Sequence, residues 1–227
     1  MTPVAVIEKF KKEGGFFHPQ NKNFIDKVRK IKALVFDWDG VFNEGYKTEA
    51  SAQGFNEIDS IGINLLRFAF WLRTNTILPV GIISGQHNNE VRFMAERENI
   101  NSIFTGYKNK SKAFDIFCQK YYVKDDYVAY VFDDVLDFSI AKYCGLRFMV
   151  QRKANPLMND YAERKFLFDY STFSGCNDFA VREVTELLAS LMYDYDKLLE
   201  LRIDFSEQYI TYFSERNRIK TEHFLFE

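Results

Sequence analysis

Four short apolar runs, each followed by a stretch with helical spacing, set the fold class of this chain. The runs are rich in Val, Ile and Phe, and they are ALVFD (33–37), ILPVGIIS (77–84), YVAYVFD (127–133) and LRFMV (146–150). Runs of this length without polar alternation are typical of strands buried on both faces. Their alternation with helices predicts an α/β fold in three layers, with a central parallel sheet between helices.

Polar residues stand at the ends of three of these runs, namely Asp37, Ser84 and Asp133. In an open α/β sheet the loops that carry function converge at the carboxyl ends of the strands. Asp or Ser at a single strand end often does no more than begin a turn. The coincidence of all three at one predicted edge indicates a functional site.

The residues around these strand ends form a constellation suited to phosphoryl transfer. Paired carboxylates repel each other when buried unless a cation compensates, so Asp37 and Asp39 predict a positive charge beside them. Carboxylates from two strand ends suit Mg²⁺, and a hydroxyl and a lysine beside the ion would hold phosphate oxygens. In chain order the constellation is Asp37 with Asp39, then Ser84, then Lys110 in FTGYKNKSK, then Asp133, Asp134 and Asp137 in FDDVLD.

The order and spacing of these residues resemble the haloacid dehalogenase superfamily of phosphatases. The motifs of that family are DxD, a strand ending in Ser or Thr, a Lys, and an acidic pair near a strand end. The resemblance implies a Rossmann-like fold, with Asp37 as the nucleophile that accepts the phosphoryl group and Asp39 as the general acid and base. It also implies that Ser84, Gly85 and Lys110 bind phosphate.

The same resemblance implies a magnesium site. Its residues are Asp37, Asp133, the main-chain carbonyl of Asp39, and Asp137, which acts through the waters of the metal or by orienting Lys110. Asp134 is an alternative to Asp137. Lys112 is a rival of Lys110, but Lys110 lies four residues after Gly106 and so matches the GxxxK spacing of the family.

The distances between motifs leave no room for a cap domain. A helix and a strand occupy about half of the 46 residues between Asp37 and Ser84, and residues 43–59 suffice only for a short β-hairpin flap. The chain therefore looks like the capless group that dephosphorylates 3-deoxy-octulosonate 8-phosphate and nonulosonate 9-phosphates. This resemblance covers about residues 32–190, and it rests on DGVFNEG, FNEIDSIGINLL, IISG, GYKNK, DDVLD, ANP and FAVREVTELL.

Several positions depart from the pattern of that group. Phe132 replaces a glycine before the acidic pair, Gln86 and Ile58 replace two arginines, and GCNDF replaces a glycine-rich turn. One alternative is therefore a catalytically weakened binding or scaffolding protein on the same fold. Another is a receiver-type signalling domain, although its phospho-accepting Asp stands alone on a middle strand.

Three segments are expected along the chain: a helical lead-in (1–30), the phosphatase core (31–180) and a helical extension (181–227). The extension contains no Gly or Pro, and apolar residues recur in it at spacings of four and three, which predicts a helix of about 30 to 40 residues. Such a helix would outreach a small domain, so we expect a homo-oligomer. The resemblance implies a tetramer, because neighbouring subunits of a tetramer cover the capless active site in that family. The alternative is a helix pair that folds back near Asp204 and Ser206.

Composition argues against two classes of partner, nucleic acid and membrane, and leaves the small phosphorylated metabolite that the motif residues imply. The net charge of −2 and the absence of a basic stretch argue against nucleic acid, and no apolar run reaches the ~20 residues that span a bilayer. Cys118, Cys144 and Cys176 are too widely spaced for a zinc site or a disulfide framework, and are expected to be buried or half-buried thiols. A cytoplasmic protein is the simplest expectation.

Overall fold

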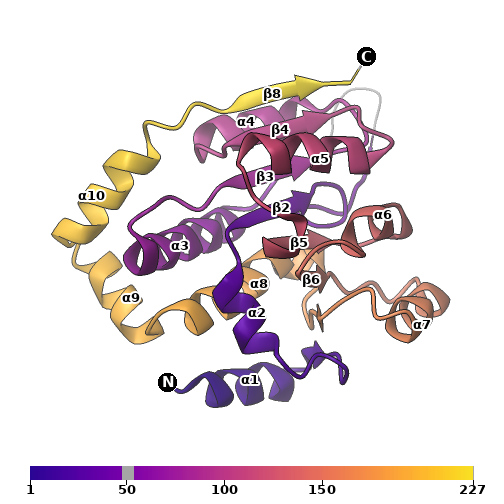
Figure 1. Ribbon diagram of the computed structural model, residues 1–227, viewed down its shortest axis with the longest axis horizontal. Helices are drawn as coiled ribbons and strands as arrows, with labels where there is room; N and C mark the ends of the chain where they lie inside the picture. Colours follow the sequence, from indigo (N-terminus) through magenta and orange to yellow (C-terminus); the bar gives the residue numbers. More distant parts are fainter. Residues whose placement is uncertain (48–53, 227) are drawn as a thin grey trace.

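The computed structural model describes residues 1–47 and 54–226, and within them it contains one eight-stranded sheet. The strand order is β1-β7-β6-β5-β2-β3-β4-β8, and all neighbouring pairs are parallel except β1 with β7 (Figure 1). The strands are β1 (Phe16–Phe17), β2 (Ala33–Asp37), β3 (Val80–Ile83), β4 (Ser102–Thr105), β5 (Val128–Phe132), β6 (Leu146–Met149), β7 (Tyr170–Ser171) and β8 (Glu222–Leu225).

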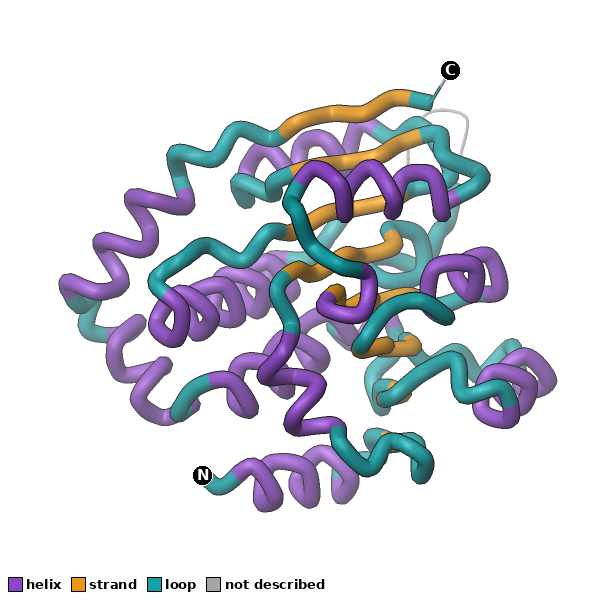
Figure 2. The backbone as a smooth tube through the Cα atoms, in the orientation of Figure 1, coloured by secondary structure: helices purple, strands orange, loops and turns teal. Residues whose placement is uncertain are grey.

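Helices cover both faces of this sheet and give the three predicted layers (Figure 2). None of them, in the ranges that the structure describes, is long and apolar enough to cross a membrane. The α-helices are α1 (Pro3–Lys12), α2 (Phe24–Lys30), α3 (Glu57–Thr74), α4 (Asn89–Arg97), α5 (Lys110–Lys120), α6 (Phe138–Ala141), α7 (Pro156–Arg164), α8 (Ala180–Met192), α9 (Tyr195–Ile203) and α10 (Glu207–Arg216). Short 3-10 helices span Asp125–Tyr127, Val135–Asp137 and Cys176–Asp178.

The central strand β2 divides the hydrophobic core in two, because successive side chains point to opposite faces. Ala33 and Val35 pack in the cluster that contains α5 and α6. Leu34 and Phe36 pack in the cluster that contains α3 and α8. All of these side chains are fully buried, which explains why the strand reads as an unbroken apolar run.

Helices α3 and α8 approach each other closely at Gly62. A Cβ at this position would lie 2.3 Å from Thr185 Oγ1, so only glycine permits the contact. At the start of α3, Asp59 accepts a hydrogen bond from the backbone N–H of Arg182 at 2.8 Å. The second oxygen of Asp59 is buried and has no hydrogen-bond partner among the described residues.

Burial raises the pKa of Asp59 from 3.8 to about 7. The folded protein therefore holds this proton more tightly than the unfolded chain, and the free energy of unfolding should fall as the pH rises from about 4 to about 7. Asp59→Asn should remove this part of the decline and exceed the wild type in stability by about 1 kcal/mol or more at pH 8. Urea denaturation across this pH range measures the difference.

The control for this prediction is Asp26→Asn, since the Asp26 side chain is 65% exposed. Its pH profile should match that of the wild type. If the profile of Asp59→Asn also ran parallel to the wild-type profile, the buried carboxyl would not be responsible for the loss of stability.

The prediction of one long C-terminal helix is wrong. The segment forms α8, α9 and α10, because Tyr193 is extended and Asp194 and Ser206 cap new helices by accepting the backbone N–H of Lys197 and Tyr209. The apolar stripe packs on its own domain: the rings of Tyr209 and Tyr212 lie 5.1 and 5.2 Å from that of Phe68 in α3. The segment thus packs on its own domain and turns between Asp204 and Ser206, as in the alternative, but it has a further break at Tyr193 and forms three helices instead of a pair.

The chain then adds β8, which the sequence analysis assigned to the helical extension, as a parallel edge strand beside β4. The strands β1, β4 and β7 were also not predicted. In the ranges described, no cap domain is inserted between β2 and α3 or between α5 and β5. The central part of the predicted hairpin flap, residues 48–53, lies outside the described residues. Cys144 is buried and the other two thiols are half-buried, as predicted.

Candidate active site

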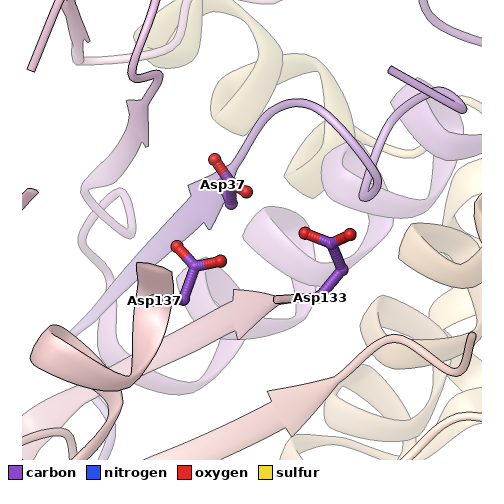
Figure 3. Close-up of side chains that lie close together, drawn as sticks. All are labelled: Asp37, Asp133 and Asp137. Atoms are coloured by element: carbon purple, nitrogen blue, oxygen red, sulfur yellow. The ribbon is translucent and has the colours of Figure 1, made fainter. Parts of the chain in front are cut away.

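Three buried carboxylates meet at the carboxyl edge of the sheet. Asp37 ends β2, Asp133 follows β5, and Asp137 lies in the short 3-10 helix after it. Figure 3 shows them pointing into one space, where one oxygen of each lies within 4.8 Å of the others. Their exposed fractions are 5%, 2% and 1%.

Lys110, the first residue of α5, reaches into this cluster and is itself buried. Its Nζ lies 2.6 Å from Asp37 Oδ1 and donates a hydrogen bond to Asp137 Oδ1 at 2.6 Å. Burial alone lowers the pKa of Lys110, but the two carboxylates outweigh it and raise the pKa above its usual value. Tyr130 also donates to Asp137 Oδ1, at 2.5 Å, so this carboxylate is fixed from two sides.

Asp133 has a cationic neighbour in Arg152, whose Nε lies 2.6 Å from Asp133 Oδ2 without the alignment of a hydrogen bond. Burial nevertheless raises the pKa of Asp133 to about 7. Burial and the neighbouring Asp137 raise the pKa of Asp37 well above its ordinary value. The protein's own cations therefore leave the negative charge of the cluster incompletely compensated.

The cluster forms the floor of a cavity of 520 Å³. Its described lining has two more acidic than basic side chains, and the converging donors are carboxylate oxygens, which Mg²⁺ prefers. The residues present thus fit a divalent cation held by Asp37, Asp133 and Asp137. The charged residues of the lining are Asp37, Asp39, Glu44, Lys47, Lys108, Lys110, Asp133, Asp134, Asp137 and Arg152.

The other predicted site residues lie around this cluster. The Asp39 carboxylate lines the cavity but stands outside the triad and pairs with Lys47 at 2.8 Å. Gly85 also lines the cavity. Ser84 is buried and does not line the cavity, and its hydroxyl donates to the carbonyl oxygen of Gln86 at 3.1 Å.

The two members of each pair of alternative residues, Lys110 with Lys112 and Asp137 with Asp134, lie in different surroundings. Lys112 lies over the ring of Phe226, 5.6 Å from its centroid, and does not line the cavity. Asp134 caps the 3-10 helix by accepting the backbone N–H of Val135 at 2.6 Å, whereas Asp137 belongs to the triad. The roles of these residues stay predictions. Of the two lysines only Lys110 reaches the carboxylate cluster, and of the two aspartates only Asp137 belongs to it.

Gly40 permits the close approach of the loop after β2 to Asp133. Its φ is +84°, and a Cβ would lie 2.0 Å from Asp133 Oδ2 and 2.1 Å from Arg152 Nη2. Gly40→Ala should therefore displace Asp133 and lower the free energy of unfolding by about 1–3 kcal/mol through backbone strain alone. Urea denaturation measures this loss, and titration with Mg²⁺ should reveal weaker binding.

Gly85→Ala is the matched control, because the nearest atom to its added Cβ is the Tyr107 carbonyl oxygen at 4.0 Å. The free energy of unfolding of this variant should lie within about 0.5 kcal/mol of the wild-type value. Equal stability of the two variants would contradict the close packing at Gly40.

Comparison with known proteins finds phosphatases among the relatives of this chain. No protein-family model matches the chain. The 3-deoxy-D-manno-octulosonate 8-phosphate phosphatase of Salmonella typhi is 30% identical over 176 residues, which are 76% of this chain and 86% of that protein. The enzyme of the same name from Escherichia coli K12 is 29% identical over the same shares of the two chains.

Solved structures share the fold. The 3-deoxy-D-manno-octulosonate 8-phosphate phosphatase of Moraxella catarrhalis, solved with magnesium ion, phosphate ion and KDO, is 23% identical with a TM-score of 0.64. The match covers 79% of this chain and 97% of that one. The enzyme of the same name from Yersinia pestis is 25% identical with a TM-score of 0.63, over 78% of this chain and 89% of that one.

Proposed function

This chain belongs to the 3-deoxy-D-manno-octulosonate 8-phosphate phosphatase family of the haloacid dehalogenase superfamily, and on that premise we propose that it is a Mg²⁺-dependent phosphomonoesterase. The substrate class is a small phosphorylated ulosonic acid, such as 3-deoxy-octulosonate 8-phosphate. The observation that carries the proposal is the convergence of Asp37, Asp133 and Asp137 around Lys110 on the floor of one cavity.

In the proposed reaction, Asp37 is the nucleophile. Its free carboxylate oxygen attacks the phosphorus atom, the bond from phosphorus to the sugar oxygen breaks, and Asp39 gives its proton to the leaving oxygen. Asp39 then takes a proton from water, which attacks the phosphorus of the aspartyl phosphate and releases inorganic phosphate. Lys110 is a proposed phosphate ligand, and its two contacts at 2.6 Å also position Asp37 and Asp137.

Repulsion between Asp37 and the phosphate group is the main obstacle to this attack. Bound Mg²⁺ supplies positive charge that reduces the repulsion, and Asp37, Asp133 and Asp137 are the residues that would hold it. The main-chain carbonyl of Asp39 is a further proposed ligand. Gly85 lines the cavity and offers its backbone N–H to phosphate oxygens, and Ser84 supports the turn in which Gly85 lies.

Phe132 does not support the alternative of a weakened scaffold. Its ring is fully buried, packs against the rings of Tyr130 and Phe138 at 5.4 and 6.0 Å, and does not line the cavity. The residue that replaces the family's glycine therefore adds to the core without filling the site.

Phosphate release from a panel of sugar and ulosonate phosphates, with and without Mg²⁺, tests the proposal. We expect Mg²⁺-dependent release, with the ulosonate phosphates among the preferred substrates. If the protein released phosphate from no member of the panel, the proposed function would be contradicted.

We also propose a cytoplasmic protein that assembles into a homo-oligomer, with a tetramer favoured. Large apolar side chains remain exposed in the C-terminal region of a single chain, including Ile203 in α9, Phe205 in the turn after it and Ile210 in α10. Light scattering of the full chain measures its mass in solution and so tests the assembly.

A further inference from the structure

One lysine on the wall of the cavity bridges two side chains of the proposed site. Lys47 Nζ donates hydrogen bonds to Asp39 Oδ2 and to Gln86 Oε1, both at 2.8 Å. Asp39 is the proposed general acid, and Gln86 is a neutral residue where the resemblance predicts arginine. Lys47 therefore places a positive charge beside the position where the expected one is missing.

Two of the other three cations in the described lining, Lys110 and Arg152, differ from Lys47 in their partners, and the third, Lys108, serves as a control in the test below. Lys110 is buried between Asp37 and Asp137, and Arg152 is paired with Asp133. The Lys47 side chain is 37% exposed and that of Asp39 is 30% exposed, so a ligand can reach both. Of these three paired cations, Lys47 is the one that contacts the proposed general acid.

The second expected arginine position does not supply the missing charge. Ile58 lines a different hollow, together with Phe10 and Phe179, and is not part of the catalytic cavity in the described residues. A cation that recognises an acidic substrate must therefore come from another element. Lys47 lies beside Gln86, where the arginine was expected. The distance of 2.8 Å from its Nζ to Asp39 Oδ2 shows that this lysine can bind a carboxylate there.

We propose that Lys47 is the specificity-determining residue that binds the carboxylate of the substrate. This inference rests on the proposed function and assigns one residue to the recognition of the carboxylate that its substrates carry. When such a substrate binds, its carboxylate takes the place of Asp39 as the partner of Lys47. Asp39 Oδ2 is then released to face the leaving oxygen, so recognition of the acid and exposure of the general acid occur together.

The test compares the kcat/KM of two phosphate monoesters, 3-deoxy-octulosonate 8-phosphate, which carries a carboxylate, and ribose 5-phosphate, which does not, as a ratio of the first to the second. A hydrogen bond to a charged group is worth about tenfold to a hundredfold in binding, so Lys47→Gln should lower this ratio by about that factor. The double variant Lys47→Gln with Gln86→Arg should restore much of the ratio. Gln86 Oε1 lies 2.8 Å from Lys47 Nζ, so an arginine at position 86 would return a positive charge to the same place.

Two lysines serve as controls in this test. Lys108→Gln removes another charge of the cavity lining, and Lys112→Gln removes a nearby charge outside it. Both should change the ratio less than threefold, which is under about 0.7 kcal/mol. A ratio unaffected by Lys47→Gln, or lost instead in Lys108→Gln, would overturn the inference.

Calorimetry with free 3-deoxy-octulosonate and its methyl ester separates this inference from the proposed function. The wild type should bind the acid more tightly than the ester, and Lys47→Gln should bind both alike. If the protein released no phosphate but kept this Lys47-dependent preference, the proposed reaction would fail and the inference would stand. If it were an active phosphatase without the preference, the inference alone would be wrong.

Discussion

Asp37→Asn should lower phosphate release by about 10⁴-fold or more while the protein stays folded. The amide cannot attack phosphorus, and the substitution removes one of the three negative charges expected to hold the metal ion. The fold should tolerate the change, because burial and neighbouring acids disfavour the charge of Asp37 in the free protein. Steady-state kinetics and thermal unfolding of the same preparation measure both effects.

Asp115→Asn is the matched control, since this residue lies on the exposed surface of α5. It should retain the activity and the melting temperature of the wild type. If Asp37→Asn kept near-full activity, Asp37 would not be the nucleophile. If Asp37→Asn lost activity only because it unfolded, its melting temperature would fall well below that of the wild type.

Removal of Mg²⁺ should abolish activity and lower thermal stability. A ligand that binds only the folded state stabilises it by about 2.7 kcal/mol at 100 times its Kd, which corresponds to about 5 to 10 °C in Tm for a chain of this size. The gain should grow with Mg²⁺ concentration, because the ion relieves repulsion among the buried carboxylates. Thermal unfolding in EDTA and in a series of Mg²⁺ concentrations measures it.

Asp133→Asn should lose most of this Mg²⁺-dependent gain, whereas Asp115→Asn should keep all of it. A melting temperature indifferent to Mg²⁺, together with activity that persists in EDTA, would show that the cluster is not a metal site.

The central strands were predictable because their residues are buried on both faces and read as apolar runs. The predicted runs extend beyond some strands: β3 begins at Val80, after Ile77, Leu78 and Pro79. The edge strands β1 and β8, and β7 beside β1, have only two to four residues, too few to show an apolar run, so their pairing with neighbours defines them.

The C-terminal region shows how caps override periodicity. Apolar spacing continues through residues 181–212, but Asp194 and Ser206 accept backbone N–H groups at 2.9 and 3.2 Å and start new helices. These residue types are favoured N-caps, so a signal was present in the sequence. A long uninterrupted stripe was nevertheless a poor guide to one helix, since the bends allow the stripe to pack on α3.

In the candidate site, residues with motif spacing were predictable and isolated ones were not. The order of Asp37, Lys110 and Asp133 points to one edge of the sheet, where the structure brings them together. Lys47 and Arg152 lie in loops without a motif, and only the folded chain brings them to Asp39 and Asp133. Single charges in loops usually belong to the solvated surface, so composition gave no reason to select them.

Chemical trapping of the phosphorylated aspartate tests the central claim most directly. The wild type would be mixed with 3-deoxy-octulosonate 8-phosphate and Mg²⁺, quenched, and reduced with borohydride, which converts an aspartyl phosphate to homoserine. Mass spectrometry should then locate homoserine at position 37, only when both substrate and Mg²⁺ are present. Steady phosphate release with homoserine at another residue, or with none at position 37, would contradict the account.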